Sequence, residues 1–182
     1  MNIIKTAIPD VLIIEPKVHG DHRGFFMETW RQSMFDEIQP GINFVQDNHS
    51  RSSHGILRGL HYQLKHPQGK LVRVVAGEIF DVAVDMRKSS PTFGHWEGLV
   101  LSAENRRQLW VPPGFAHGFY VMSESAEMVY KCTGYYVPAD EYSLCWDDPD
   151  IAVDWPLAAE EVPVLSDKDS NGLNLHEAPL YS

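Results

Sequence analysis

The feature that most constrains the fold is a succession of short β-type segments. Runs rich in Val, Ile, Phe, Tyr and Trp alternate with Gly, Pro, Asp and Ser, and no long apolar stripe has the 3.6-residue spacing of an amphipathic helix. So many strands require two packed sheets or a barrel. The predicted strands are Val11–Ile14, Phe25–Thr29, Phe44–His49, Ile56–Gln63, Lys70–Ala76, Glu78–Asp85, Gly98–Ser102, Gln108–Val111, Gly118–Met122 and Ala126–Thr133.

Helix is a minor component of the prediction, with two turns over Arg31–Ile38 and one turn over Ser102–Asn105. The 182-residue length and 43% hydrophobic content predict a single domain over 1–182. From about residue 156 the pattern weakens into Pro, Glu and Asp, so this C-terminal tail is expected to wrap the surface. The predicted class is all-β with short peripheral helices.

The charge balance and the apolar runs exclude several classes of function. Lys and Arg total 15 against 25 Asp and Glu, a net charge of −10, which disfavours nucleic acid but allows a small phosphorylated ligand held by a few local cations. No apolar run reaches the ~18 residues of a membrane span, and the first residues lack the pattern of a signal peptide. A cytoplasmic protein is expected. Cys132 and Cys145 are predicted to be buried thiols.

The stretch Leu57–Gln63 places Arg58 and His61 within three residues of each other. A cation and an imidazole are costly to bury without a function, although a half-exposed strand with satisfied polar groups is the ordinary alternative. Residues three apart on a regular strand face opposite sides. The two side chains can therefore share a pocket only if Gly59 bends or bulges the strand.

Three further positions have side chains that could act in catalysis or could have an ordinary structural role. Lys70 could bind a phosphate or stabilise an oxyanion, but it could also be a solvated strand end. Tyr130 could donate a proton or could pack in the core. A carboxylate of Leu165–Asp169 could orient a histidine, whereas an exposed charged turn is the alternative.

The segment Pro112–His117 fits the pattern PxGxxH, which resembles the second motif of the cupin superfamily. That superfamily has a double-stranded β-helix, or jelly roll, which suits the predicted strands. Metal-binding cupins carry HxH in their first motif, but the corresponding stretch here is His61-Tyr62-Gln63. With the second histidine replaced, no three-histidine metal site is expected.

Taken together, the motifs resemble the dTDP-4-dehydrorhamnose 3,5-epimerase family over nearly the whole chain and in the family's order. The segments that carry the resemblance are Gly20–Glu28, Phe44–Ser50, Leu57–Gln63, Gly69–Val74, Ser90–Gly94, Pro113–Phe119, Tyr130–Lys131, Tyr136–Pro138, Trp146–Pro149 and Leu165–Asp169. The resemblance implies a cupin-like jelly roll that, without metal or cofactor, inverts C3 and C5 of dTDP-4-dehydro-6-deoxy-glucose in dTDP-L-rhamnose biosynthesis. The C4 ketone acidifies both neighbouring C–H bonds, so each inversion can pass through an enolate.

The resemblance also implies roles for individual residues. His61 would be the base, Tyr130 the proton donor on the opposite face, and Lys70 the cation at the enolate oxygen. Asp167 would orient His61, with Asp169 as the alternative. Substrate-binding positions would be Arg23, Glu28, Gln46, Asp47, Asn48, Arg58, Lys70, His117, Tyr136, Glu141 and Lys168, with Tyr136 stacking on thymine and Arg23 and Arg58 binding the diphosphate.

Family members are homodimers whose N-terminal strands cross to the partner, so Arg23 and Glu28 are expected to serve the other subunit's pocket. His19 and His22 depart from the family pattern, which bears on nucleotide affinity. Three alternatives stay open: a 3- or 5-epimerase of a related dTDP-4-keto-sugar, a metal-dependent cupin, and a nucleotide-sugar binding protein. The binding protein would keep the arginines without needing a base and a donor.

Overall fold

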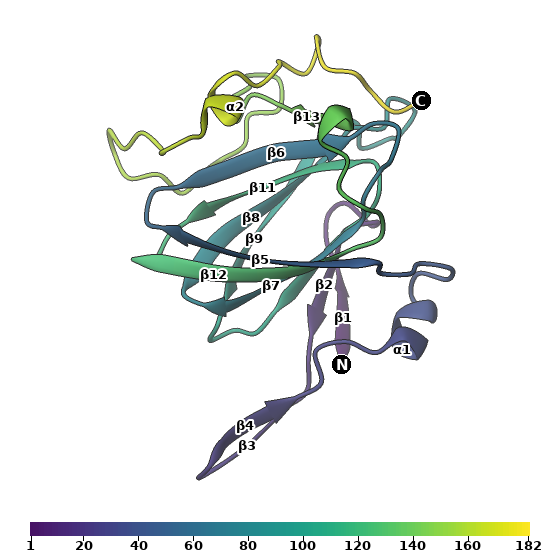
Figure 1. The fold of residues 1–182 in the computed structure, drawn as a ribbon, viewed down its shortest axis with the longest axis vertical. Coiled ribbons are helices and arrows are strands. Elements are labelled where there is room, and N and C mark those ends of the chain that lie inside the picture. The colour runs from purple at the N-terminus through teal and green to yellow at the C-terminus, as the bar shows by residue number, and fades with distance from the viewer.

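The computed structural model describes residues 1–182 as two antiparallel sheets packed face to face, with a separate two-stranded hairpin below them (Figure 1). In spatial order the six-stranded sheet contains β1 (Asn2–Lys5), β2 (Leu12–Glu15), β10 (Gln108–Val111), β7 (Lys70–Ala76), β12 (Ser125–Cys132) and β5 (Gln46–Ser53). The five-stranded sheet contains β13 (Glu141–Ser143), β6 (Leu57–Gln63), β11 (Phe115–Val121), β8 (Glu78–Asp85) and β9 (Trp96–Ser102). The hairpin pairs β3 (Val18–Asp21) with β4 (Gly24–Met27).

The all-β prediction is confirmed, and helix is confined to short peripheral pieces. These are α1 (Gln32–Asp36), α2 (Asp167–Ser170) and the 3-10 turn η1 (Pro138–Asp140). The single turn predicted at Ser102–Asn105 is present, closed by the Arg106 N–H that donates to the Ser102 carbonyl at 3.0 Å, and it does not continue into a helix. The prediction missed β1, β3 and β13, which are only three or four residues long.

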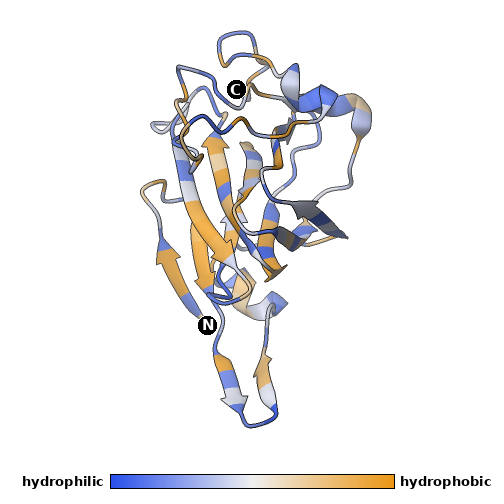
Figure 2. Cartoon of the chain, turned by 90° about the vertical axis from the view of Figure 1, so that its left-hand side faces the viewer, coloured by the Kyte–Doolittle hydropathy of each residue, from blue (hydrophilic) through white to orange (hydrophobic).

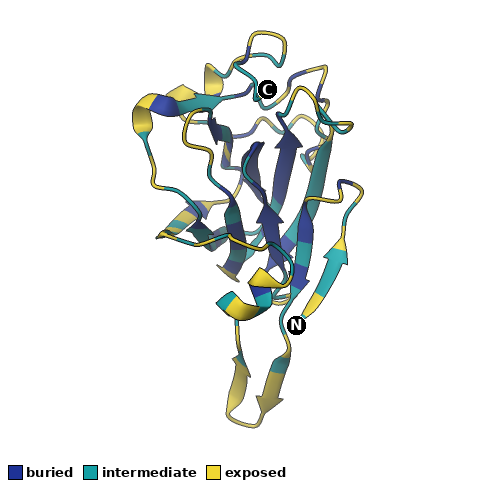
Figure 3. Cartoon of the chain, turned by 90° about the vertical axis from the view of Figure 1, so that its right-hand side faces the viewer, coloured by how far each residue is buried: buried dark blue, intermediate teal, exposed yellow.

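The main core lies between the two sheets. Inward side chains of β7 and β12, such as Val72 and Met128, pack against those of β8 and β11, such as Ile79 and Phe119. Figure 2 shows hydrophobic residues along the strands of the two sheets, and Figure 3 shows the buried residues concentrated in these sheets. Burial of each such side chain contributes about 1.5–3 kcal/mol, so the two sheets form a firm frame for polar groups at their open side.

The C-terminal segment covers the outer face of the five-stranded sheet. Trp155 and Ala178 pack with Leu57 and Tyr62 of β6 in a second apolar cluster. Parallel bridges of Ile56 with Val164, Leu144 with Leu173 and Arg87 with Tyr181 fix the path of the segment. This path brings α2 alongside β6 (Figure 1).

The β3–β4 hairpin projects away from the body and is largely exposed (Figure 3). Phe25 and Phe26 are 58% and 73% exposed, and the Arg106 guanidinium lies 4.4 Å from the centre of the Phe25 ring. The hairpin thus presents two aromatic side chains to solvent.

No helix of the structure is long and apolar enough to cross a membrane.

Candidate active site

A cavity of about 290 Å³ opens between the two sheets. Its walls come from β5, β7 and β12 on one side and from β6 and β11 on the other, with residues before and on β13 at the rim. The predicted residues that line it are Gln46, Asn48, Arg58, His61, Lys70, His117, Tyr130, Tyr136, Glu141 and Lys168. Five further residues line the cavity that nothing in the sequence marks as functional: Ser50, Gln68, Gly118, Phe119 and Met128.

A bulge at Gly59 places Arg58 and His61 in the same cavity, as predicted. The pairing of β6 with β11 shifts register at this point, and Gly59 has φ +115°. A Cβ at this position would lie 2.5 Å from Gly118 Cα, so only glycine fits. The Arg58 Nε donates to the buried Ser52 Oγ at 3.0 Å, which fixes the direction of its guanidinium.

His61 is held from behind by a carboxylate. Its Nε2 lies 2.5 Å from Asp169 Oδ1, and the other oxygen of Asp169 accepts from Ser166 Oγ at 2.8 Å. Burial alone would raise the pKa of Asp169, but the hydrogen bond and charge of His61 outweigh it and lower that pKa. This neighbour fixes the ring orientation and leaves Nδ1 as the free nitrogen of His61.

The prediction that Asp167 orients His61 is therefore wrong, and the alternative residue does so. Both carboxylates lie in α2, whose N-cap is Ser166. Successive helical residues are rotated by about 100°, so two residues two apart point to nearly opposite sides. Asp169 packs against His61 and is only 3% exposed, whereas Asp167 points into solvent.

Tyr130 lies on the wall opposite His61, because it belongs to β12 of the six-stranded sheet and His61 to β6 of the other. Burial raises the pKa of Tyr130, with a smaller contribution from neighbouring acidic groups such as Cys132. The phenol therefore keeps its proton at neutral pH. The cavity thus has an imidazole on one side and a protonated hydroxyl on the other.

Lys70 lies at the start of β7 and also lines the cavity. Burial lowers the pKa of its ammonium, partly opposed by neighbouring acidic groups that include the carboxylates of Glu141 and Asp81. The only lysines in ion pairs are Lys131 and Lys168. The Lys70 ammonium is therefore free to bind an anionic oxygen in the cavity.

A second histidine–carboxylate pair forms the floor of the cavity. His117 Nε2 lies 2.7 Å from Asp81 Oδ1, and both side chains are buried. Burial lowers the pKa of His117, although Asp81 opposes this. Asp81 was not among the predicted site residues; a carboxylate between Phe80 and Val82 of a predicted strand was the available signal.

Glu141 stands at the rim, beside His61. Its Oε2 accepts from Lys168 Nζ at 2.6 Å and from the Tyr136 hydroxyl at 2.9 Å, and its Oε1 lies 3.8 Å from His61 Nδ1. Burial would raise the pKa of Glu141, but Lys168, His61 and Tyr136 together lower it. The rim is thus a connected polar network around the free nitrogen of His61.

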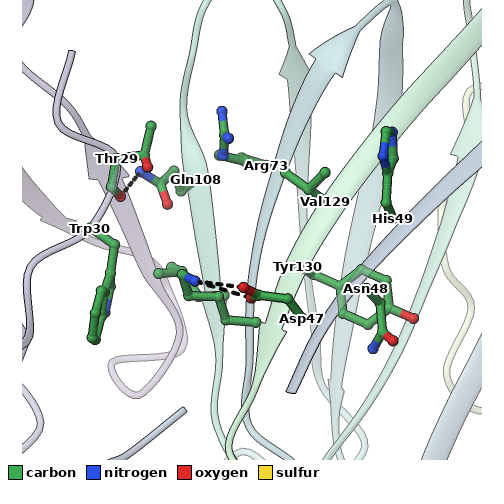
Figure 4. Close-up of a pocket in the computed structure, with 11 residues that line it drawn as sticks. Thr29, Trp30, Asp47, Asn48, His49, Arg73, Gln108, Val129 and Tyr130 are labelled. Carbon is green, nitrogen blue, oxygen red and sulfur yellow. Dashed lines mark hydrogen bonds and ion pairs between the residues drawn. The ribbon is translucent and has the colours of Figure 1, made fainter. Parts of the chain in front are cut away.

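Three predicted binding residues lie outside this cavity. Asp47 is contradicted as a side-chain ligand of this pocket, because adjacent residues of β5 face opposite sides and its carboxylate is 70% exposed. The Asp47 carboxylate accepts from Lys131 Nζ at 3.0 Å. Figure 4, a close-up of a different pocket, shows the Asp47 side chain pointing toward the Trp30 side of that pocket and the Asn48 side chain pointing away from it. Arg23 pairs with Asp21 on the hairpin and Glu28 with Arg31, so neither lines the pocket of its own chain.

No group of three or more His, Cys, Asp or Glu side chains in the chain is arranged to hold a metal ion. The polar side chains of the cavity instead form pairs and one rim network.

Residues 5–177 match the family described as dTDP-4-dehydrorhamnose 3,5-epimerase. The chain is 58% identical over 183 residues to the dTDP-4-dehydrorhamnose 3,5-epimerase of Shigella flexneri, a match covering 100% of this chain and 99% of the relative. The crystal structure of dTDP-6-deoxy-D-glucose-3,5-epimerase from Legionella pneumophila in complex with dTDP-4-keto-L-rhamnose is similar at a TM-score of 0.95 and 54% identity, covering 99% of this chain and 97% of that one. A 3'-monoepimerase from Streptomyces bikiniensis in complex with dTDP-quinovose is similar at 0.87 and 35% identity, covering 94% and 87%.

Proposed function

The chain belongs to the dTDP-4-dehydrorhamnose 3,5-epimerase family, an isomerase of dTDP-L-rhamnose biosynthesis, and we propose that His61 and Tyr130 carry out its two inversions from opposite sides of the sugar ring. The substrate is dTDP-4-dehydro-6-deoxy-glucose and the product is dTDP-4-dehydro-L-rhamnose. The observation that supports the two roles best is the position of a free imidazole nitrogen and a protonated phenol on facing walls of one cavity.

His61 Nδ1 removes the proton at C3, and the electron pair of that C–H bond moves onto the C4 oxygen to form an enolate. The ammonium of Lys70 stabilises the negative oxygen. Tyr130 then gives its phenolic proton to the opposite face of the same carbon, which inverts it, and regains a proton from solvent. The same sequence at C5 completes the reaction, and Asp169 stabilises the imidazolium each time.

The remaining cavity residues bind the nucleotide in this proposal. Arg58 offers its terminal nitrogens to the diphosphate, because its Nε is already occupied by Ser52. Tyr136, 49% exposed at the rim, stacks on thymine. His117, Gln46, Asn48, Glu141 and Lys168 are the further substrate contacts.

A homodimer completes the pocket in this proposal. The hairpin presents Phe25, Phe26 and an Arg23 side chain that is 78% exposed. Exposed aromatic side chains of this kind mark an interaction surface, here for a second copy of the chain. Arg23 and Glu28 then serve the partner's cavity. Mixing inactive Arg23→Ala and His61→Asn chains should restore activity, because a mixed dimer has one pocket with both wild-type residues; no recovery after subunit exchange would oppose this assignment.

The protein acts in the cytoplasm on a nucleotide-sugar in this proposal, without a nucleic acid, membrane or metal partner. The net charge of −10 supports the absence of a nucleic-acid partner, since an acidic protein repels polyanions.

The catalytic assignment is tested by two single variants with dTDP affinity measured alongside. His61→Asn should abolish turnover at both carbons while dTDP binds nearly as tightly as to the wild type. Tyr130→Phe should allow His61 to abstract the proton but impair protonation of the opposite face. Exchange of the substrate hydrogen with solvent should therefore continue in this variant while inversion is much slower. Normal turnover by either variant would contradict the role given to that residue.

A further inference from the structure

The two oxygens of the Glu141 carboxylate have different surroundings. Oε2 accepts hydrogen bonds from Lys168 and Tyr136, whereas Oε1 accepts none and faces His61 Nδ1 at 3.8 Å. The Glu141 side chain is only 12% exposed. A mostly buried carboxylate oxygen without a donor, aimed at an imidazole nitrogen, has unused capacity to accept a proton.

The nitrogen that Glu141 faces is the one that takes the substrate proton in the proposed reaction. Nε2 of His61 is occupied by Asp169 at 2.5 Å, so abstraction must place the new proton on Nδ1. After that step the ring is an imidazolium between two carboxylates, with Asp169 on one side and Glu141 on the other.

A double inversion by one base imposes a further requirement. Tyr130 delivers the replacing proton, so the proton taken by His61 does not return to carbon. His61 must lose it before it can abstract the second proton. Loss through Nε2 to Asp169 would leave the hydrogen on Nδ1 and therefore the tautomer that cannot act as a base. The acceptor that resets the ring must lie on the Nδ1 side.

We propose that Glu141 is a proton relay, whose Oε1 takes the proton from His61 Nδ1 between the two inversions and passes it to solvent. The inference rests on the assignment of His61 as the base. In the step, the Nδ1–H bond breaks and an Oε1–H bond forms; the nitrogen keeps its electron pair and Nε2–H still donates to Asp169. Glu141 then returns to a carboxylate by giving the proton to water.

The surroundings of Glu141 suit such a transient carrier. Lys168, whose side chain is 49% exposed, connects the carboxylate to the open rim of the cavity. Lys168 also favours the charged form of Glu141, which speeds release of the proton. The 3.8 Å gap is longer than a hydrogen bond, and catalytic contacts of this kind shorten when substrate is bound.

The test is a single turnover with enzyme in excess over dTDP-4-dehydro-6-deoxy-glucose, quenched at intervals and resolved into substrate, mono-epimer and product. Glu141→Gln keeps an acceptor for Lys168 and Tyr136 but cannot carry a proton. The rate of the second inversion relative to the first should fall by about tenfold to a hundredfold, so mono-epimer accumulates. Added formate should speed the second inversion selectively.

Lys168→Met is the matched control, because it removes the same ion pair while keeping the carboxylate. Within one turnover Glu141 takes up a single proton before the second abstraction, so slower release from Glu141 does not delay that step. Lys168→Met should therefore change both inversions together and accumulate no mono-epimer. Equal slowing of both steps by Glu141→Gln, or no rescue by formate, would overturn the relay. Thermal unfolding and dTDP binding of each variant exclude a folding defect. If the His61→Asn variant still inverts the substrate, His61 is not the base. The proposed function then fails independently of the result for Glu141→Gln.

Discussion

The pair of variants Asp169→Asn and Asp167→Asn gives the sharpest test of how the base is oriented. Asp169 makes a buried contact of 2.5 Å with His61 Nε2, and abstraction turns this contact into an ion pair. Hydrogen bonds to charged groups contribute about 1.5–3 kcal/mol, and removing one member of a buried pair costs about 3–5 kcal/mol. A loss of about 3 kcal/mol in the transition state corresponds to a kcat about 10² lower.

The assay is steady-state turnover coupled to the dTDP-4-dehydrorhamnose reductase, with dTDP affinity measured separately. Asp169→Asn should lower kcat by about a hundredfold and leave dTDP affinity nearly unchanged. Asp167→Asn changes an exposed carboxylate two residues away and should stay within about twofold of the wild type. A large loss for Asp167→Asn with normal turnover for Asp169→Asn would refute the orientation derived from the structure.

Three further outcomes follow from single contacts. Ser52→Ala frees the Arg58 guanidinium and should raise KM about tenfold with kcat retained, as steady-state kinetics will show. Gly59→Ala puts a Cβ 2.5 Å from the backbone of β11, so calorimetry should show a loss of about 2–4 kcal/mol in unfolding free energy. Burial opposes ionisation of Asp85, but bonds from Arg87 and its neighbours lower its pKa to about 2, below the unfolded value near 3.8. Its contribution of about 2 kcal/mol should be complete above pH 4 and lost as the pH falls through 2, so the stability difference between wild type and Asp85→Asn should shrink over that range.

The strand framework was predictable because a buried face imposes alternation on β-type residues. The strands predicted from Lys70 to Ala76 and from Glu78 to Asp85 appear as β7 and β8 within the predicted bounds, although they lie in different sheets and do not pair as a hairpin. The strands that were missed lack this signal. β3, for example, contains the polar or small residues His19, Gly20 and Asp21, and neither of its faces is buried in the chain. Pairing in an exposed hairpin leaves no hydrophobic pattern to detect.

The chemistry of the site was partly predictable from motif spacing, and the orientation of neighbours was not. The need for a bulge at Gly59 followed from strand geometry alone. The choice between Asp167 and Asp169 depends on the rotation of one helical turn, which two closely spaced carboxylates do not reveal. Asp81 and Asp47 both lie in alternating strands, but only the packing of the sheets decides that the first is buried and the second is exposed.

The most direct test of the account is proton NMR of dTDP-4-dehydro-6-deoxy-glucose incubated in D2O with the purified, EDTA-treated protein. One base and one donor on facing walls should exchange the hydrogens at both C3 and C5, and the product should be accepted by the dTDP-4-dehydrorhamnose reductase. Exchange at C3 alone would contradict the double inversion and indicate a 3-epimerase. No exchange despite tight dTDP binding would contradict catalysis of this reaction altogether.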